Sequence, residues 1–501
     1  MNVVLRPVVA GLVCLLSSGA IVACSSGKAG PGATLRGTGG SGNDGSAGSL
    51  IVGTSGAGSS GLAVSDGGSS ATTADCGSGP ATSISGTVYD PAGQVPLYNI
   101  VLFVPGAALD PISTGAACQT CDGDYSGKPQ AVALSDAKGH FEIDNAPSGD
   151  NVPLVIQVGK WRREVTIPHV APCMDNPIMD KDMTRLPRNH TEGDIPHMAI
   201  ALGGSDSLEC LIRRIGVDDS EFTTPDLDGR VHLYRWAENA AMTMQENGNG
   251  ASATVPSADT LWSNLDSLMK YDMMLMSCTG ESKLGASDQD FINVRKYADQ
   301  GGRIFGSHFH NDWIRTDAET GTDPLWYPQV VKFSEGAHGI TNPLTAQIDT
   351  SFPKGQSFSD WLTNVGASTT PGQIVVQGAE HTIDSVLPQA ILSPDTPTYA
   401  MGPGAQQWIY ATDPTSASKP TQTVQYFSMN TPVGGAECGR MVFSDLHVAT
   451  GSGDTTKVPF PTGCSTTPLT PQEKALEFML FDLSSCVQSD QDPPVPPVVV
   501  K

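Results

Sequence analysis

Side chains that can bind metal ions or transfer protons gather at two places in this sequence, each just after an apolar run. They are Ser307, His308, His310, Asp312, Asp445 and His447. Imidazole and carboxylate groups suit zinc, iron or manganese, and the same groups act as general acids and bases. If the fold brings the two places together, the sequence predicts metal-assisted hydrolysis or proton transfer there.

The spacing of these residues supports two alternative sites. His308 and His310 stand two positions apart, and side chains with that spacing in a strand point to the same face. The same spacing recurs at Asp445 and His447. A metal site would hold a divalent transition metal on His308, His310, Asp312 and His447. A catalytic site would use Ser307, His308, Asp445 and His447.

Neither alternative has a complete motif behind it. The chain contains no H-E-x-x-H and no G-x-S-x-G, so a serine hydrolase built on Ser307 is the weaker catalytic interpretation. A third alternative is that these residues have no chemical role and only form hydrogen bonds with one another and with the loops. Asp218 and Glu281 follow other predicted elements and are further candidates. We predict no site at the histidines that stand alone in the sequence, which are His190, His197, His232, His338 and His381.

The elements that must position the first group lie in residues 271–313. Residues 271–278 are an apolar run of strand length, as in a strand buried on both faces of a parallel sheet. Ser287 is a suitable N-cap for a helix that Gly301 and Gly302 would end, and residues 303–309 begin the next strand. Such a βαβ unit places a ligand site past the carboxyl ends of its strands, where the histidines stand.

Strands and helices alternate through the rest of this region. Further strands are predicted at 197–202, 231–235 and 439–446, and helices at 207–215, 258–269 and 471–483. The pattern weakens between 323 and 424, where the candidates are strands at 347–352 and 374–377 and a helix at 357–365. Residues 423–429 read as one more strand. Alternation of this kind predicts that residues 196–487 form a three-layer, flavodoxin-like α/β domain with a mostly parallel sheet.

Three segments of this region, 271–277, 297–308 and 439–447, resemble the class I glutamine amidotransferase-like superfamily and, within it, the ThuA-like branch. Active amidotransferases carry a cysteine nucleophile in a G-x-C-x-G turn after the second of these segments. This chain reads Gly306-Ser307-His308-Phe309-His310 there, and ThuA-like proteins commonly have a histidine at this place. A histidine cannot form the thioester, so the resemblance implies a domain without amidotransferase activity.

An all-β region precedes the α/β region. Short strands separated by turns are predicted at 83–89, 99–104, 131–134, 140–143, 153–158 and 162–167, and this pattern indicates a β-sandwich over residues 81–172. Residues 85–90, 135–141 and 146–149 resemble the carboxypeptidase regulatory-like domain, which has a prealbumin-like fold. The resemblance implies a spacer or a carbohydrate-binding accessory. Residues 173–195 are predicted to be a polar connector.

The amino-terminal residues read as an export signal. An arginine at position 6 precedes an apolar run, and Ile21-Val22-Ala23-Cys24 resembles the lipobox of bacterial lipoproteins. The resemblance implies cleavage of signal peptide 1–24 and lipidation of Cys24, with an ordinary cleaved signal as the alternative. Residues 25–80 have the Gly/Ser-rich composition of a disordered tether, and the proline-rich residues 488–501 read as a disordered tail.

The net charge limits the class of partner, and the number of cysteines predicts disulfides with one unpaired thiol. A formal net charge of −24 argues against nucleic acid as a partner, because phosphate binding needs an excess of Lys and Arg. Of eleven cysteines, Cys14 would leave with the signal and Cys24 would be lipidated, so an odd number remains for disulfides. Cys278, at the end of an apolar strand, is the candidate for the unpaired thiol. The pair Cys118 and Cys121 favours a disulfide over zinc.

Two functions fit these observations. The first is a lipoprotein anchored to the bacterial cell envelope, at the outer membrane or cell surface, that binds a carbohydrate or another surface partner or serves as a structural module. The alternative is an exported metal-dependent or acid/base hydrolase or isomerase that acts on a carbohydrate-like small molecule.

Overall fold

The computed structural model describes residues 73–121, 123, 125–236, 243–280, 285–314, 329–391, 399–415, 421–448, 452–497 and 499. The predicted signal peptide with Cys24 lies outside these residues, as does nearly all of the predicted tether. The described chain is mostly β, with one large ten-stranded sheet, four smaller sheets and few helices.

Two sheets form the amino-terminal β-region. One has the order β4-β1-β7 and the other β3-β2-β5-β6. The strands are β1 (Ser83–Thr87), β2 (Val101–Pro105), β3 (Pro129–Leu134), β4 (His140–Asp144), β5 (Gly149–Val158), β6 (Trp161–Val170) and β7 (Asp175–Ile178). Ile84, Leu102 and Leu154 of the two sheets are fully buried in a common core. Strands β1 to β6 correspond to the six strands predicted between residues 83 and 167.

Strand β7 lies inside the predicted connector 173–195, so that boundary is wrong. It pairs in parallel with β1, and the Asp175 carboxylate accepts hydrogen bonds from Ser83 Oγ (3.0 Å) and Ser85 Oγ (2.9 Å). The sequence Asp-Asn-Pro-Ile shows no apolar alternation, because an edge strand of this kind is held by backbone pairing and polar side chains rather than by burial.

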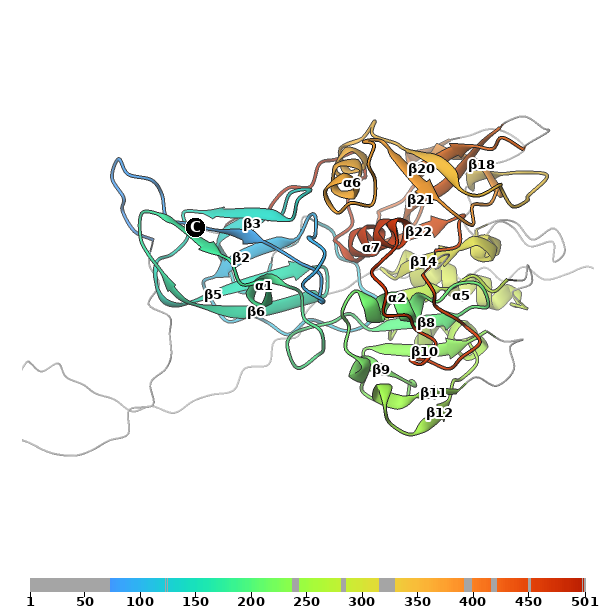
Figure 1. Ribbon diagram of the computed structural model, residues 1–501, viewed down its shortest axis with the longest axis horizontal. Coiled ribbons are helices and arrows are strands. Elements are labelled where there is room, and N and C mark those ends of the chain that lie inside the picture. The colour runs from blue at the N-terminus through green and yellow to red at the C-terminus, as the bar shows by residue number, and fades with distance from the viewer. Residues whose placement is uncertain are drawn as a thin grey trace, which may run out of the picture. The chain divides into compact units, whose positions relative to one another are not determined.

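The ten-stranded sheet carries the rest of the chain. Its order is β17-β16-β20-β21-β22-β14-β13-β8-β10-β9, and Figure 1 shows it running from β9 and β10 through β8, β14 and β22 to β20. The strands are β8 (Met198–Leu202), β9 (Phe222–Thr223), β10 (Val231–Arg235), β13 (Met273–Met276), β14 (Arg303–Ser307), β16 (Leu344–Ile348), β17 (Gln373–Val376), β20 (Ala405–Thr412), β21 (Gln422–Thr431) and β22 (Gly439–Ser444).

This sheet is mixed rather than mostly parallel. Strands β9, β10, β8, β13, β14 and β22 pair in parallel, whereas β21, β20, β16 and β17 are antiparallel additions. The additions come largely from the region 323–424, which also supplies a three-stranded antiparallel sheet of β15 (Gln329–Phe333), β18 (Ile383–Ile391) and β19 (Tyr399–Pro403). Antiparallel neighbours need no crossover helix, so the alternation of strands and helices is lost there.

Helices cover both faces of the parallel strands. Successive residues of one strand enter different cores: Leu275 belongs to one buried cluster and Met276 to the other. Helix α7 (Pro471–Ser484) contributes Leu476 to the first cluster, and α5 (Asp288–Asp299) contributes Val294 to the second. The two helices therefore pack on opposite faces (Figure 1).

The starts of α5 and α7 are where the sequence predicts them. Ser287 and Asp290 form a capping box on α5, and Thr470 and Glu473 form one on α7. The predicted helix at 258–269 is instead two short helices, α3 (Asp259–Trp262) and α4 (Leu265–Leu268). The remaining helices are α1 (Lys181–Thr184), α2 (Leu208–Arg214) and α6 (Pro353–Asn364).

Four disulfides cross-link the described chain. They are Cys76–Cys173, Cys118–Cys438, Cys121–Cys486 and Cys210–Cys464. The disulfide prediction for Cys118 and Cys121 is confirmed, although each pairs with a distant cysteine rather than with the other. Two bonds join the segment after β2 to the carboxyl-terminal part. Cys278 is the free thiol of the described chain, as predicted, and it is buried.

The folded part reaches beyond the predicted boundary at 487. Asp490 is only 8% exposed and forms buried ion pairs with Arg440 (2.8 Å) and Lys354 (3.3 Å). The predicted disordered tail at 488–501 therefore begins too early. Asp490 and Asp482 together pair with these two buried cations, and the high proline content of the segment gave no indication of this role for Asp490.

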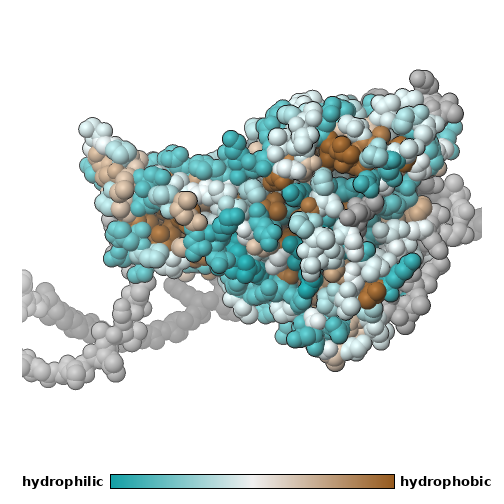
Figure 2. All heavy atoms as spheres, in the orientation of Figure 1, coloured by the Kyte–Doolittle hydropathy of each residue, from teal (hydrophilic) through white to brown (hydrophobic). Residues whose placement is uncertain are grey.

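The surface shows no continuous apolar face in the view of Figure 2, where hydrophobic residues form separate patches among polar ones. Of the large exposed hydrophobic residues, Met174 and Met179 flank β7, whereas Val375 lies in β17. None of the helices in the described part of the chain has the length and apolar character needed to cross a bilayer.

Candidate functional site

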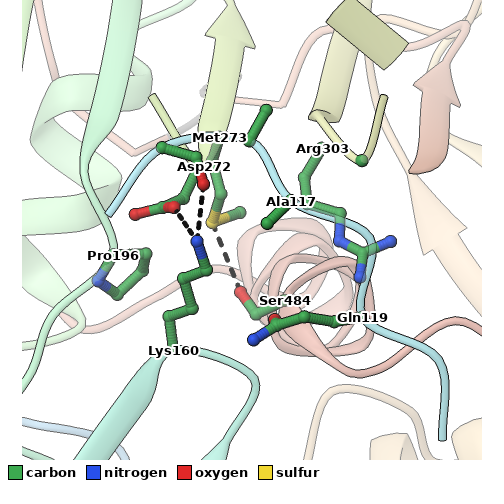
Figure 3. Close-up of a pocket in the computed structure, with 11 residues that line it drawn as sticks. Ala117, Gln119, Lys160, Pro196, Asp272, Met273, Arg303 and Ser484 are labelled. Carbon is green, nitrogen blue, oxygen red and sulfur yellow. Dashed lines mark hydrogen bonds and ion pairs between the residues drawn. The ribbon is translucent and has the colours of Figure 1, made fainter. Parts of the chain in front are cut away.

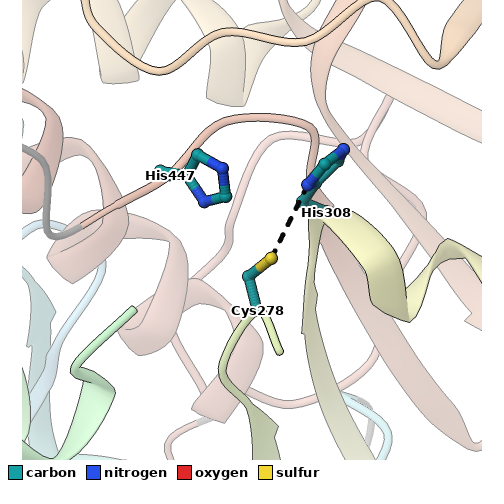
Figure 4. A group of neighbouring side chains, drawn as sticks. All are labelled: Cys278, His308 and His447. Atoms are coloured by element: carbon teal, nitrogen blue, oxygen red, sulfur yellow. Dashed lines mark hydrogen bonds between the residues drawn. The ribbon is translucent and has the colours of Figure 1, made fainter. Parts of the chain in front are cut away.

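Three potential ligands meet past the carboxyl ends of adjacent parallel strands. Cys278 follows β13, His308 follows β14 and His447 follows β22, and these strands are neighbours in the sheet. Figure 4 shows the thiol and the two imidazole rings facing a common space. The predicted meeting of His308 and His447 is therefore present in the structure, with a sulfur atom between them that the predicted site lacked.

The three side chains are close enough to share one ion. The Cys278 Sγ atom lies 3.6 Å from His308 Nδ1, and the ring centroids of His308 and His447 are 5.2 Å apart at nearly a right angle. One ligand atom from each of the three residues lies within 4.8 Å of the other two. Cys278 is fully buried and His308 is 6% exposed, whereas His447 is half-buried and forms the accessible side of the cluster.

The carboxylate of Asp206 ties the three strand ends together. Asp206 Oδ2 accepts hydrogen bonds from Ser307 Oγ (2.5 Å) and from the backbone N–H of Cys278 (3.3 Å), and Oδ1 accepts one from the N–H of Val448 (3.0 Å). The same Oδ1 lies 3.8 Å from Nδ1 of His447. This distance is too long for a hydrogen bond, so the buried carboxylate acts on the His447 ring through its charge. The hydroxyl of Ser307 donates to Asp206 in this structure.

The turn after β14 sets the position of His308. The strand ends at Ser307, and His308 has a φ of +40°, a left-handed conformation that is uncommon for any residue with a Cβ. A short 3-10 helix, His308–Trp313, follows at once. His308 and His310 were expected to point to the same face of a continuing strand. The strand ends at Ser307, so this expectation is wrong.

His310 is a structural residue in this fold and not a ligand. Its Nδ1 accepts a hydrogen bond from Trp313 Nε1 (3.1 Å), and its Nε2 lies 3.0 Å from the carbonyl oxygen of Ser277, to which it donates. Both ring nitrogens are therefore used. Burial lowers the pKa of His310 to about 4, so the ring stays neutral.

The other predicted site residues of the described chain do not contribute to the three ligand atoms that converge here. The Asp445 carboxylate accepts the backbone N–H of Thr382 at 2.8 Å, and burial raises its pKa to about 8. Asp218 accepts a hydrogen bond from Asn189 Nδ2 at 2.5 Å. Asp312 is half-buried and is not among the described side chains whose ligand atoms converge. Glu281 lies outside the described residues.

The two imidazoles of the cluster differ in basicity. Burial, with the neighbouring His447, lowers the pKa of His308 to about 4. Burial also acts to lower the pKa of His447, but the Asp206 carboxylate and the Cys278 sulfur outweigh it and raise that pKa to about 10. One neutral imidazole, one basic imidazole and one thiol share the space.

The residue types and the distances fit zinc. Tetrahedral zinc bound at about 2.3 Å to sulfur and about 2.0–2.1 Å to nitrogen separates those ligand atoms by about 3.6 Å. This equals the observed separation of Cys278 Sγ and His308 Nδ1. Three protein ligands would leave a fourth position open. Sequence reasoning did not include Cys278 among the candidate ligands, although an unpaired cysteine just past a strand end was the available signal.

A second polar recess lies near the opposite ends of β13 and β14 (Figure 3). Lys160 Nζ donates to Gly115 O (2.6 Å) and forms an ion pair with Asp272 (2.5 Å), and both side chains are buried. Arg303 also lines the recess, and its two terminal nitrogens are buried without a hydrogen-bond partner in the structure. The sequence held no signal for this recess, because its residues come from distant elements.

Comparisons with known proteins leave the family open. No family model matches the chain, and no curated protein matches it. Among solved structures, a Thermoplasma acidophilum protein assigned as part of a GMP synthase is 12% identical over 57% of this chain and 92% of its own, with a TM-score of 0.27. A type II cohesin–X-dockerin complex from Acetivibrio cellulolyticus is 14% identical over 30% of this chain and 79% of that one, with a TM-score of 0.15.

Proposed function

We propose that this chain is a lipoprotein of the bacterial cell envelope whose sheet-containing body holds a zinc ion on Cys278, His308 and His447. The observation that carries the proposal is the 3.6 Å separation of the Cys278 sulfur and the His308 nitrogen at the ends of adjacent parallel strands. The body would have no amidotransferase activity, because His308 stands where that chemistry needs a cysteine. Anchoring through Cys24 and a carbohydrate-like surface partner belong to the same proposal.

The fold assignment within the proposal is a flavodoxin-like core with antiparallel additions, preceded by a prealbumin-like sandwich. Parallel strands in the order β22-β14-β13-β8-β10, with helices on both faces, support the core assignment. Ligands of such sheets bind at the carboxyl ends of the strands, which is where the cluster lies.

A second candidate is thiol chemistry at the same atoms. The group contains the residue types that a cysteine nucleophile uses, with the Cys278 thiol 3.6 Å from His308 and the Asp206 carboxylate 3.8 Å from His447. The sulfur is fully buried, however, and the half-open side of the cluster is occupied by His447. A buried thiol suits a metal ligand better than a nucleophile that must reach a substrate.

Metal analysis of the purified full-length protein tests the proposal. We expect about one zinc per chain at this site, retained on dialysis, and its loss in Cys278→Ser and in His447→Ala. His169→Ala is the matched control, because His169 is an exposed histidine that pairs with Asp150 at 2.6 Å in the β-sandwich region. If Cys278→Ser keeps the full zinc content of the wild type, the zinc site is not at this cluster.

Reactivity of Cys278 separates the two candidates. A zinc ligand should resist alkylation in the native protein until a chelator is added. A nucleophile should react before any chelator, with a rate that falls when His308 is replaced.

A further inference from the structure

A second group of potential ligands lies outside the cluster described above. His338 lies between β15 and β16, His381 closely precedes β18 and Asp413 directly follows β20. The sequence places these residues more than 30 positions apart, and each histidine looks isolated. Asp413 and His381 are buried, whereas the His338 side chain is 39% exposed.

The three ligand atoms converge on one point. Asp413 Oδ2 lies 2.8 Å from His338 Nε2 and 2.9 Å from His381 Nδ1. Two ligands bound at about 2.1 Å and a right angle to each other would be about 3.0 Å apart. The observed separations are close to that value, so little movement is needed for an ion to bind.

The outer nitrogen of His338 is engaged, whereas that of His381 makes no hydrogen bond in the structure. His338 Nδ1 lies 2.7 Å from the carbonyl oxygen of Gly336, and a carbonyl can only accept, so this nitrogen carries the proton. His381 Nε2 lies 3.3 Å from a carboxylate oxygen of Asp384. Metal-bound histidines usually direct their other nitrogen at a carbonyl or carboxylate in this way.

The contact between His338 and Asp413 lacks a hydrogen when the His338 ring is neutral. If the His338 ring is neutral, its Nε2 lone pair faces the carboxylate oxygen of Asp413 at hydrogen-bond distance with no hydrogen between them, whereas His381 can carry its hydrogen on Nδ1 and donate it to that oxygen. The other oxygen of Asp413 accepts bonds from the N–H and the hydroxyl of Thr415 (2.8 and 2.7 Å). The His338 contact therefore requires either one extra proton or a cation bound between the two atoms.

We infer that His338, His381 and Asp413 form a second metal site, which takes a divalent first-row transition ion. Two imidazoles and one carboxylate on one side of an ion suit zinc, iron or manganese and leave coordination positions open. The inference does not depend on the zinc site at Cys278, because the two sites share no ligand.

Cobalt titration of the metal-free full-length protein tests this inference, because cobalt bound to a thiolate has an intense charge-transfer absorption that cobalt bound to nitrogen and oxygen lacks. We expect the wild type to bind two equivalents, one at each converging group of ligands. His338→Gln and Asp413→Asn should each remove the equivalent without the thiolate band. Asp384→Asn should weaken that equivalent by about tenfold to a hundredfold.

Cys278→Ser is the control for the other site, because it should remove only the equivalent with the thiolate band. The half-exposed His338 is chosen so that its variant folds, and far-ultraviolet circular dichroism checks that it does. The inference is overturned if Asp413→Asn and His338→Gln bind as much cobalt as the wild type, or if Cys278→Ser abolishes all binding. Failure of the zinc proposal alone would appear as a missing thiolate band with the second equivalent intact.

Discussion

Buried acidic side chains near the strand-end cluster, above all Glu209, should make the stability of the protein depend on pH. Glu209 in α2 is fully buried and its Oε2 atom has no hydrogen-bond partner in the structure. Burial, with the nearby carboxylates of Asp454 and Asp206, raises the pKa of Glu209 to about 8. The folded protein therefore prefers this group in its protonated, uncharged form.

The protonation of Glu209 gives a prediction for stability. Because its folded-state pKa lies above the ordinary value of 4.5, the stabilising contribution is complete below pH 4.5 and is lost as pH rises through about 8. Glu209→Gln should flatten this dependence and raise the free energy of unfolding at pH 8 by roughly 2–4 kcal/mol. Urea unfolding of both proteins at pH 5 and pH 8 measures it. Equal pH dependence in the two proteins would contradict the assignment.

Some residues of the two clusters could be predicted from the sequence and others could not. His308 and His447 were predicted to meet because parallel neighbouring strands end at the same edge of a sheet. Asp206 was not identified, because its role depends on three backbone segments that converge only in the fold. His338, His381 and Asp413 could not be predicted for the same reason: antiparallel strands, which have no regular spacing along the chain, bring them together.

The turn between β14 and the following 3-10 helix decides which side chains enter the site. His308 adopts a left-handed φ of +40°, which glycine tolerates and alanine does not. We expect His308→Gly to be more stable than His308→Ala by about 1 kcal/mol, although both lose the imidazole. Urea unfolding of the two variants in the presence of a chelator measures the difference. A more stable alanine variant would mean that the turn is not left-handed.

Elements with local signals were predicted well. Ser287 is the predicted N-cap of α5, and a helix is predicted from residue 471; α5 and α7 start at these places, each with a capping box in the structure. The end of β14 was predicted two residues too late. Nothing in the sequence Ser307-His308-Phe309 indicates that His308 adopts a positive φ and ends the strand. Strand β18 was missed because its pairing with β15 and β19 includes irregular register shifts.

The β-sandwich region and the large sheet are joined by buried polar contacts as well as by disulfides. Lys160, between β5 and β6, pairs with Asp272, just before β13, and both side chains are about 6–7% exposed. Asp272 also accepts the N–H of His197 at 2.7 Å. Burial raises the pKa of Asp272 although Lys160 opposes the shift, so the carboxylate depends on its partner.

Removal of one partner should therefore destabilise the whole molecule. We expect Lys160→Met to lower the free energy of unfolding by about 3–5 kcal/mol, because it leaves a buried carboxylate unpaired. Lys160→Met combined with Asp272→Asn should recover part of this loss. Chemical denaturation under non-reducing conditions, which keep Cys118–Cys438 and Cys121–Cys486 intact, measures the effect. A loss below about 1 kcal/mol would show that the pair is solvated.

The ion at the strand ends is the central claim, and X-ray absorption at the zinc edge of the native protein tests it most directly. With zinc on Cys278, His308 and His447, the first shell should contain one sulfur at about 2.3 Å and nitrogen or oxygen at about 2.0–2.1 Å. Cys278→Ser should lose the sulfur shell. A wild-type spectrum with no sulfur scatterer would contradict the claim.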